Sequence, residues 1–138
     1  MKKLFSSFRK PREREQEGLR RSIDRRTAEA LKRWTEDGGA LSPCRGLGEA
    51  ADQIGVNKEQ LSWYFHRYLH TTFYQWRKEQ RIAAAKALLL DDPGISLSEL
   101  AAGVGIDDKS NMRRQFMEVT GMTPAQWIRA NQGRLRDT

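Results

Sequence analysis

Cysteine and histidine are scarce in this chain of 138 residues, and long apolar runs are absent from its sequence. The single cysteine, Cys44, excludes an internal disulfide and fits a reducing compartment such as the cytoplasm. His66 and His70 lie far from it and make a poor metal site, so neither a metal nor another cofactor is expected. The sequence has no apolar stretch of about 18 residues, the length needed to span a membrane. The basic start Met1-Lys2-Lys3 is not followed by the apolar run that a secretory signal has.

The sequence patterns of enzymes are also missing. There is no Gly-rich phosphate loop, no Ser or Cys beside a usable base, and no carboxylate cluster in an apolar setting, so we do not expect catalysis. No strands are evident, so the sequence does not predict the aromatic stacking platform that many RNA-binding proteins build on strands. These absences favour a binding module made of helices.

The excess positive charge is confined to one end of the chain. Residues 1–34 hold 12 Lys or Arg against 5 Asp or Glu, which equals the net charge of +7 for the whole chain. Residues 35–138 hold 13 of each kind and are neutral. DNA binding by this part would therefore depend on where individual Arg and Lys side chains lie. The basic end fits either a position next to a membrane segment or a solvated tail.

The chain contains nearly the same pattern twice. Ten positions match in order, eight with the same residue and two with a similar apolar one; five matches lie 50 positions later and five lie 51 positions later. The first five are Leu47, Glu49, Ala51, Gly55 and Val56, which match Leu97, Glu99, Ala101, Gly105 and Ile106. The second five are Leu61, Phe65, Thr72, Gln75 and Trp76, which match Met112, Phe116, Thr123, Gln126 and Trp127. Each copy is typical of a helix-turn-helix unit.

Helical periodicity predicts an all-α fold: two homeodomain-like helix-turn-helix subdomains joined by a long connecting helix and preceded by an amphipathic helix. Residues 1–16 are predicted to be a disordered basic tail, residues 17–44 a first helix and loop, residues 45–132 the double unit, and residues 133–138 a second tail. The helices of the double unit are expected at roughly 46–53, 57–69, 73–90, 96–103, 108–120 and 124–132.

One face of the first helix, expected from about Gln16 to the stop at Asp37-Gly38-Gly39, is largely apolar. That face consists of Leu19, Ile23, Thr27, Ala30, Leu31 and Trp34. It predicts packing on the double unit; a dimer seam or an arm to another domain are the alternatives. Asn57 is placed to N-cap the second helix of the first copy, and Thr123-Pro124 to begin the last helix.

In a helix-turn-helix unit the second helix lies in the major groove, and its early outward residues touch base edges. In the second copy Met112 and Phe116 are expected to point inward. The outward residues are then Lys109, Ser110, Asn111, Arg113 and Arg114. Arg can pair with guanine and Asn with adenine, so this helix is equipped to read DNA. A solvated helix face is the alternative interpretation.

The first copy is less usual. With Leu61 and Phe65 pointing inward, the outward or flanking residues are Lys58, Glu59, Ser62 and Trp63. Glu59 repels phosphate, and Trp63 packs either against DNA or in the core. Three threonines precede helix starts, where they contact phosphate or only cap the helix: Thr71, Thr72 and Thr123.

These motifs resemble the AraC/XylS family of bacterial transcription regulators over about residues 45–130. The second copy matches the family pattern at Gly105, Ser110, Phe116, Gly121, Met122, Thr123, Pro124, Trp127 and Arg129, with Ile106 and Met112 in place of phenylalanine. Arg81 and Ala85 match the connecting helix. His70 stands where the family commonly has glycine, at a position expected to need a left-handed backbone.

The resemblance implies seven helices in two subdomains, whose reading helices enter successive major grooves about 34 Å apart. It implies activation of transcription at specific promoters, with double-stranded DNA and RNA polymerase as partners. Arg33-Trp34 followed by Gly38-Gly39 also resembles the lead-in of AraC-type domains that end larger sensor proteins of Bacteroidetes. The chain is then a truncated regulator, the DNA-binding end of one, or a small stand-alone activator. The alternative function is a helical protein-interaction module without sequence-specific DNA binding.

Overall fold

The computed structural model describes the backbone of residues 10–136 and the side chains of residues 10–132. Over this range it contains seven α-helices, two shorter helical turns and no strand, which confirms the predicted all-α class. The elements are α2 (Pro11–Glu36), η1 (Gly39–Leu41), α3 (Leu47–Ile54), α4 (Lys58–Tyr64), η2 (Phe65–Leu69), α5 (Phe73–Asp91), α6 (Leu97–Gly103), α7 (Lys109–Thr120) and α8 (Pro124–Arg136).

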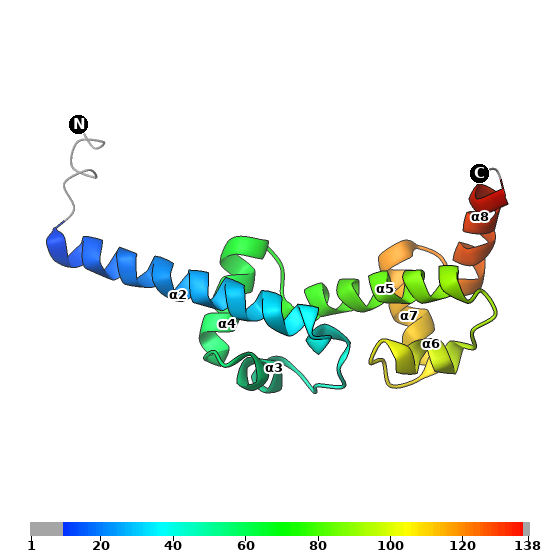
Figure 1. Cartoon of the computed structure of the whole chain (residues 1–138), viewed down its shortest axis with the longest axis horizontal. Coiled ribbons are helices and arrows are strands. Elements are labelled where there is room, and N and C mark those ends of the chain that lie inside the picture. Colours follow the sequence, from blue (N-terminus) through cyan, green and yellow to red (C-terminus); the bar gives the residue numbers. More distant parts are fainter. Residues whose placement is uncertain (1–9, 137–138) are drawn as a thin grey trace.

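The two copies of the sequence repeat form two separate helix-turn-helix units. The first consists of α3 and α4 and the second of α6 and α7, and they lie toward opposite ends of α5 (Figure 1). The π-helical turn η2 continues α4 without a break, so the first reading helix reaches Leu69 as the sequence predicts. The long connector of the prediction is α5.

Side-chain caps set the starts of the reading helices. Asn57 Oδ1 accepts from the backbone N–H of Glu59 at 2.8 Å, and Asp108 Oδ1 accepts from that of Asn111 at 2.7 Å. Each such cap stabilises a helix by about 1 kcal/mol. Asn57 and Asp108 are equivalent in the repeat, and Asp107 is the extra residue before the second cap. This one-residue insertion in the turn explains why the repeat changes its offset between Val56 and Leu61.

Each unit has its own apolar core, and α5 contributes to both. The first core contains Leu31, Trp34, Leu61, Phe65 and Phe73, and the second contains Ile82, Leu100, Met112, Phe116 and Ile128. The four residues predicted to point inward from the reading helices are 0–1% exposed. Burial of each stabilises the fold by about 1.5–3 kcal/mol, and it forces the polar residues between them outward.

The first helix departs from the prediction at its start. It begins at Pro11, so the predicted disorder of residues 11–16 is wrong, while residues 1–9 lie outside the described part. Pro11 suits the first helical turn, Glu13 complements the helix dipole there, and the Arg, Glu and Gln that follow are strong helix formers. The N-terminal part of α2 projects beyond the first unit (Figure 1).

The C-terminal part of α2 packs on the first unit, as the amphipathic stripe predicts. Thr27, Leu31 and Trp34 are buried there, whereas Leu19 is 59% exposed and does not belong to the packed face. At the other end of the chain, α8 continues to Arg136, beyond the predicted end at 132. Arg and Leu in this stretch favour helix, and one Gly does not stop it.

A buried arginine joins the two units. Nε of Arg81, on α5, donates to the carbonyl of Ala40 at 2.9 Å, and its Nη2 donates to that of Ser42 at 2.8 Å. Gly105, in the turn of the second unit, has φ 80° and lies so close to the Leu41 carbonyl that a Cβ there would collide with it. The loop after α2 is thus held between α5 and the second unit.

The family resemblance predicts a left-handed residue at position 70, after the first reading helix, and the structure has one there and at the equivalent position after the second. His70 ends η2 with φ 53°, and Gly121 ends α7 with φ 75°. A side chain costs about 1–2 kcal/mol in this conformation, and glycine loses about 0.5–1 kcal/mol more on folding. His70 therefore has the left-handed backbone conformation of the family pattern, but this conformation costs more free energy for histidine than for glycine.

We predict that His70→Gly raises the free energy of unfolding by about 0.5–1 kcal/mol, the difference between these two terms. The matched control is Gly121→His, which should lower it by a similar amount because a Cβ at Gly121 meets no atom within 4 Å and only the backbone term changes. Urea denaturation followed by circular dichroism measures both. A loss of stability in His70→Gly would contradict the prediction.

Candidate nucleic-acid interface

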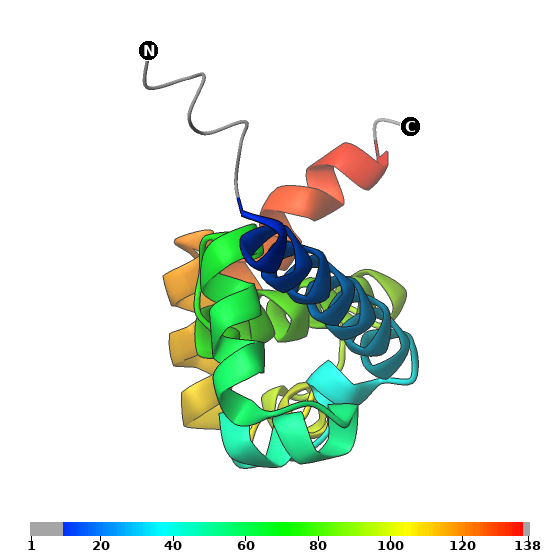
Figure 2. The ribbon, with the colours of Figure 1, turned by 90° about the vertical axis from the view of Figure 1, so that its left-hand side faces the viewer.

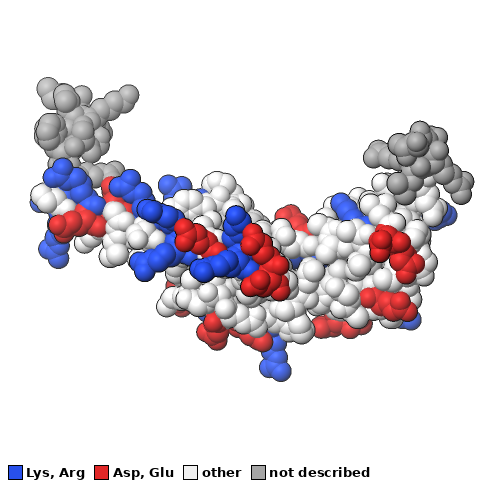
Figure 3. Space-filling model, in the orientation of Figure 1, with Lys and Arg blue, Asp and Glu red and all other residues white. Residues whose placement is uncertain are grey.

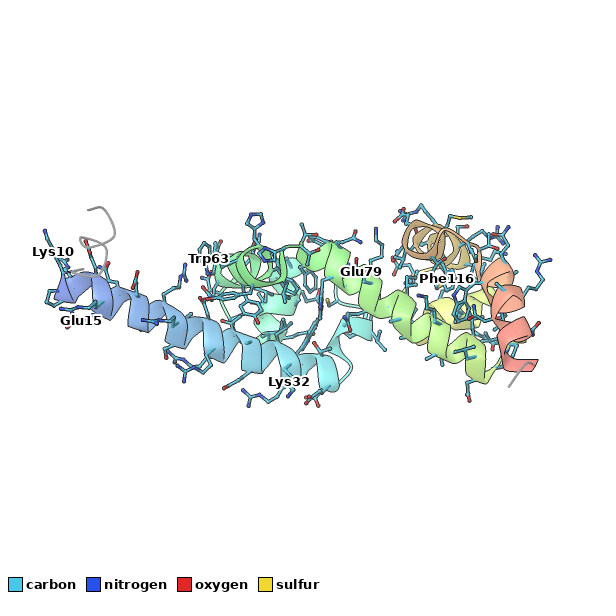
Figure 4. The ribbon with its side chains drawn as sticks, turned by 90° about the horizontal axis from the view of Figure 1, so that it is seen from above. Lys10, Glu15, Lys32, Trp63, Glu79 and Phe116 are labelled. Carbon is cyan, nitrogen blue, oxygen red and sulfur yellow. The ribbon has the colours of Figure 1, made fainter. Side chains whose placement is uncertain are left out.

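The two reading helices lie on the same side of the molecule. Figure 2 shows α4 with η2 and α7 running roughly parallel at one edge, with the C-terminal end of α2 at the other. Seen from above, Trp63 on α4 lies on the far side of the molecule from Lys32 on α2 (Figure 4). On the face that carries α2, acidic and basic side chains alternate along that helix (Figure 3). The side with α4 and α7 is therefore the candidate interface.

In the second unit the predicted readers lie at the surface of α7. Lys109, Ser110, Arg113 and Arg114 are exposed, and Asn111 is half-buried. Arg114 Nη2 donates to Asn111 Oδ1 at 2.8 Å, and Nδ2 of Asn111 donates to Asp108 Oδ2 at 3.3 Å. Asn111 and Arg114 are thus held along the helix before any ligand binds.

Glu118, which sequence reasoning did not single out, pairs with basic residues of α5 and α7. Glu118 accepts from Lys78 Nζ on α5 at 2.9 Å and from Arg114 Nη1 at 3.1 Å. The hydrogen bond from Lys78, with the charges of Lys78 and Arg114, holds the pKa of the Glu118 carboxyl below its usual range. Its spacing of four residues from Arg114 is the sequence signal that could have found it. Glu118 offsets part of the positive charge of the reading surface.

In the first unit Lys58, Glu59 and Ser62 are exposed, as predicted. Trp63 is 39% exposed and lies outside both cores, so the interpretation of Trp63 as a core residue is wrong. The guanidinium carbon of Arg20, on α2, lies 4.6 Å from the centre of the Trp63 ring. This cation–π contact places a positive charge from α2 beside the first reading helix.

A hydrogen-bonded network ties α2 to the first reading helix. The carboxylate of Asp24, only 4% exposed, accepts from Gln60 Nε2 and from the Tyr68 hydroxyl, both at 2.7 Å. Gln60 Nε2 also lies 3.2 Å from Thr27 Oγ1, and Arg20 Nη1 donates to Gln60 Oε1 at 2.7 Å. We call these five residues the α2–α4 network. It fixes α2 against the helix whose outer face carries Trp63.

The network determines the ionisation of Asp24. Burial raises the pKa of this carboxyl, but the hydrogen bonds from Tyr68 and Gln60 and the charge of Arg20 outweigh burial and hold the pKa below its usual value of 3.8. The carboxylate is therefore charged at neutral pH. Sequence reasoning missed Asp24 because a single acid in an apolar stripe reads as a surface residue until its partners are known.

Two of the three threonines before helix starts, Thr72 and Thr123, are caps. Thr72 Oγ1 accepts from the backbone N–H of Gln75 at 3.1 Å, and Thr123 Oγ1 accepts from that of Gln126 at 3.2 Å. Gln126 Oε1 accepts in return from the Thr123 N–H at 3.0 Å. The capping interpretation is confirmed for both, and contact with phosphate stays a prediction.

Over the described part of the chain, no three or more His, Cys, Asp or Glu side chains are grouped so that they could hold a metal ion. None of the helices described is both long and apolar enough to cross a membrane.

Comparison with known proteins relates this geometry to characterised domains. A family model described as a helix-turn-helix domain matches residues 50–130. The arabinose operon regulatory protein of Salmonella typhimurium is 30% identical over 81 residues, which cover 59% of this chain and 28% of that protein. The transcriptional regulator RipA of Corynebacterium glutamicum is 35% identical over 79 residues, covering 57% of this chain and 23% of its own. The chain thus spans about a quarter of the length of these relatives.

Two solved structures share the fold. The DNA-binding domain of the transcriptional factor AdpA, solved with a target DNA, has a TM-score of 0.66 at 22% identity, covering 78% of this chain and 94% of that one. An AraC-type transcriptional regulator from Chromobacterium violaceum has a TM-score of 0.61 at 21% identity, covering 77% and 90%. At these identities the likeness is one of fold.

We predict that Asp24→Asn lowers the free energy of unfolding at neutral pH by about 1–3 kcal/mol, because the neutral amide cannot accept both hydrogen bonds. A carboxyl whose pKa is lowered by folding stabilises the protein above its unfolded pKa and loses this effect as the pH falls through the folded pKa. The difference in the free energy of unfolding between the original chain and Asp24→Asn should therefore become smaller below about pH 4.

The measurement is urea denaturation of both proteins across this pH range. Asp52→Asn, at an exposed aspartate of α3, is the matched control and should stay within about 0.5 kcal/mol of the original chain. If Asp24→Asn were less stable than the original chain by the same amount at neutral and acid pH, the charge of Asp24 would not contribute to the stability of the α2–α4 network.

Proposed function

The chain belongs to the AraC/XylS-type family of helix-turn-helix domains of bacterial transcription regulators, and we propose that it binds one long, asymmetric site on double-stranded DNA as a monomer. In this proposal α4 and α7 enter two successive major grooves on one side of the duplex. Binding at promoters activates transcription in the cytoplasm through contact with RNA polymerase.

The observation that carries the proposal is the presentation of α4 and α7, roughly parallel and on one side, by the single helix α5 (Figure 2). The two units are direct repeats in sequence, and their outward residues differ. A palindromic site, which matches two-fold symmetric dimers, is therefore not expected.

The two helices take different shares of the recognition. We assign base reading mainly to α7, through Lys109, Ser110, Asn111, Arg113 and Arg114. In α4 we assign phosphate or base-edge contacts to Lys58 and Ser62, stacking against a sugar or a thymine methyl to Trp63, and acceptance of a cytosine amino group to Glu59. Thr72 and Thr123 contribute phosphate contacts from the N-terminal ends of α5 and α8.

Footprinting on a duplex selected from random sequence tests the two-groove model. The comparison is a chain with Gly-Gly inserted after Glu79, between the last first-core residue of α5, Trp76, and its first second-core residue, Ile82. Glu79 lies between the two units in Figure 4. The insertion costs about 2 kcal/mol of helix propensity and rotates one reading helix relative to the other.

We predict two adjacent protected major grooves for the original chain, and loss of both together in the insertion variant with weak non-specific binding retained. Circular dichroism checks that both units stay helical. Protection of a single groove, or a symmetric site that needs two chains, would contradict the monomeric model. Selection of no sequence at all, with binding to a protein that persists at high salt, would favour the interaction module instead.

We predict that Arg114→Ala weakens binding to the selected site by about 1–3 kcal/mol and relaxes the preference at one base pair, since a bidentate contact to guanine is lost. Repeated site selection with the variant measures the preference. Lys32→Ala, which removes an exposed charge on the opposite side of the molecule (Figure 4), is the control and should change neither quantity. Unchanged affinity and preference in Arg114→Ala would overturn the assignment.

A further inference from the structure

We propose that the cleft between the two helix-turn-helix units is a phosphate-binding site, built by Arg77 and Arg81 of α5 with Arg45 of the preceding loop. The ligand we assign is a backbone phosphate of the DNA segment between the two major grooves. This inference rests on the proposed function and adds to it a contact from residues outside both reading helices.

The cleft is a polar hollow of about 360 Å³ between the loop at Pro43–Arg45, α5 and the start of α7. A second hollow of about 300 Å³ adjoins it and shares Arg77, Arg81, Arg114 and Gln115. The cleft opens beside the reading surface, because Asn111 and Arg114 of α7 line the first hollow and Thr72 lines the second.

Two of its cations are held rigidly by the fold. Arg77 Nη1 donates to the carbonyl of Cys44 at 2.8 Å, and its guanidinium carbon lies 5.2 Å from the centre of the Phe73 ring. Arg81, only 6% exposed, is bound to the carbonyls of Ala40 and Ser42. Neither guanidinium has to lose much side-chain freedom when a ligand binds, which favours affinity.

Both guanidinium groups keep free donors. Nε and Nη2 of Arg77 and Nη1 of Arg81 have no hydrogen bond to any described residue. No buried side-chain nitrogen within the described residues lacks a partner, so Nη1 of Arg81 must be in contact with solvent. Arg81 lines the cleft and the hollow that adjoins it, so this donor is available on the side of α5 where they lie. Fixed N–H donors with a planar geometry suit phosphate oxygens.

The residues that line the cleft carry more positive than negative charge. Arg77 and Arg81 lie one helical turn apart and repel each other, and the side chain of Arg45 is exposed without an ion-pair partner among the described residues. One acid, Asp107, lines the cleft and faces the three arginines. Glu118, which lines the adjoining hollow, is already bound to Lys78 and Arg114. An anion in the cleft relieves this repulsion.

The position of the cleft points to DNA as the source of the phosphate. When two reading helices occupy successive major grooves on one side of a duplex, the intervening minor groove and its flanking phosphates face the protein between them. The cleft lies between the two units on the side that reads. A phosphate bound here would add affinity and set register without reading sequence.

The test uses the full chain and two variants, Arg45→Ala and Arg77→Gln, with Lys32→Ala as the charge-matched control on the opposite side. On the selected duplex each cleft variant should weaken binding about five- to tenfold and reduce the log–log salt slope by about 0.9, the value for one phosphate contact. Base preference should not change. Lys32→Ala should leave affinity and slope as they are. Thermal unfolding shows whether Arg77→Gln, whose side chain also holds the loop, remains folded; Arg45→Ala carries the test if it does not.

A scan with single neutral methylphosphonate linkages identifies the ligand. We expect one sensitive linkage between the two protected grooves for the original chain, and no added loss at that linkage in Arg45→Ala. The cleft proposal is wrong, and the proposed function stands, if both grooves are protected but no such linkage exists. The same holds if neutralising that linkage weakens binding of the cleft variants as much as binding of the original chain. If the chain selects no sequence, both are overturned.

A separate titration distinguishes free phosphate from DNA. Inorganic phosphate and chloride are compared at equal ionic strength for their effect on thermal unfolding. Stabilisation by millimolar phosphate that Arg77→Gln abolishes, together with a silent methylphosphonate scan, would assign the cleft to a small phosphorylated ligand and overturn the DNA source.

Discussion

Burial of Arg81 is the constraint on which the arrangement of the two units depends. A guanidinium taken out of water needs hydrogen-bond acceptors, and Arg81 finds them in the carbonyls of Ala40 and Ser42. The loop after α2 is thereby held on the middle of α5, where Leu41 packs against the second core and its carbonyl abuts Gly105. The relative orientation of α4 and α7 thus rests on a polar contact as well as on the stiffness of α5, because this loop touches both units.

The first unit depends on α2 more than a helix-turn-helix motif alone would suggest. Trp34 stacks with Trp76 and packs near Phe73, so the core of the first unit is incomplete without α2. The α2–α4 network adds polar contacts to the apolar ones. Arg20 of this network contacts Trp63, at the edge of the reading surface. An element outside residues 50–130, the part matched by the family model, therefore helps to position the first reading helix.

The reading surface combines preorganisation with charge balance. Asn111 and Arg114 are bonded to each other and to Asp108 and Glu118 in the free chain, so the side chains best suited to base edges are already ordered. Glu118 links this group to Lys78 on α5. Residues 35–138 have no net charge, and a surface of this kind binds DNA through the placement of its cations.

The sequence by itself determined the helices, the repeat and the inward positions. Apolar spacing identified Leu61, Phe65, Met112 and Phe116, because it depends on neighbours within a few residues. The left-handed turn at His70 was predicted from the resemblance to the family pattern. The predicted boundaries failed at Pro11, where local helix propensity without an apolar face was read as disorder. Only the tertiary structure decided the surroundings of Trp63, Asp24, Arg81 and Glu118. The partners of Trp63, Asp24 and Arg81, and the Lys78 partner of Glu118, lie on other helices or on a loop far away in the chain, and no local pattern records such a contact. Only the pairing of Glu118 with Arg114 follows a local spacing, of four residues.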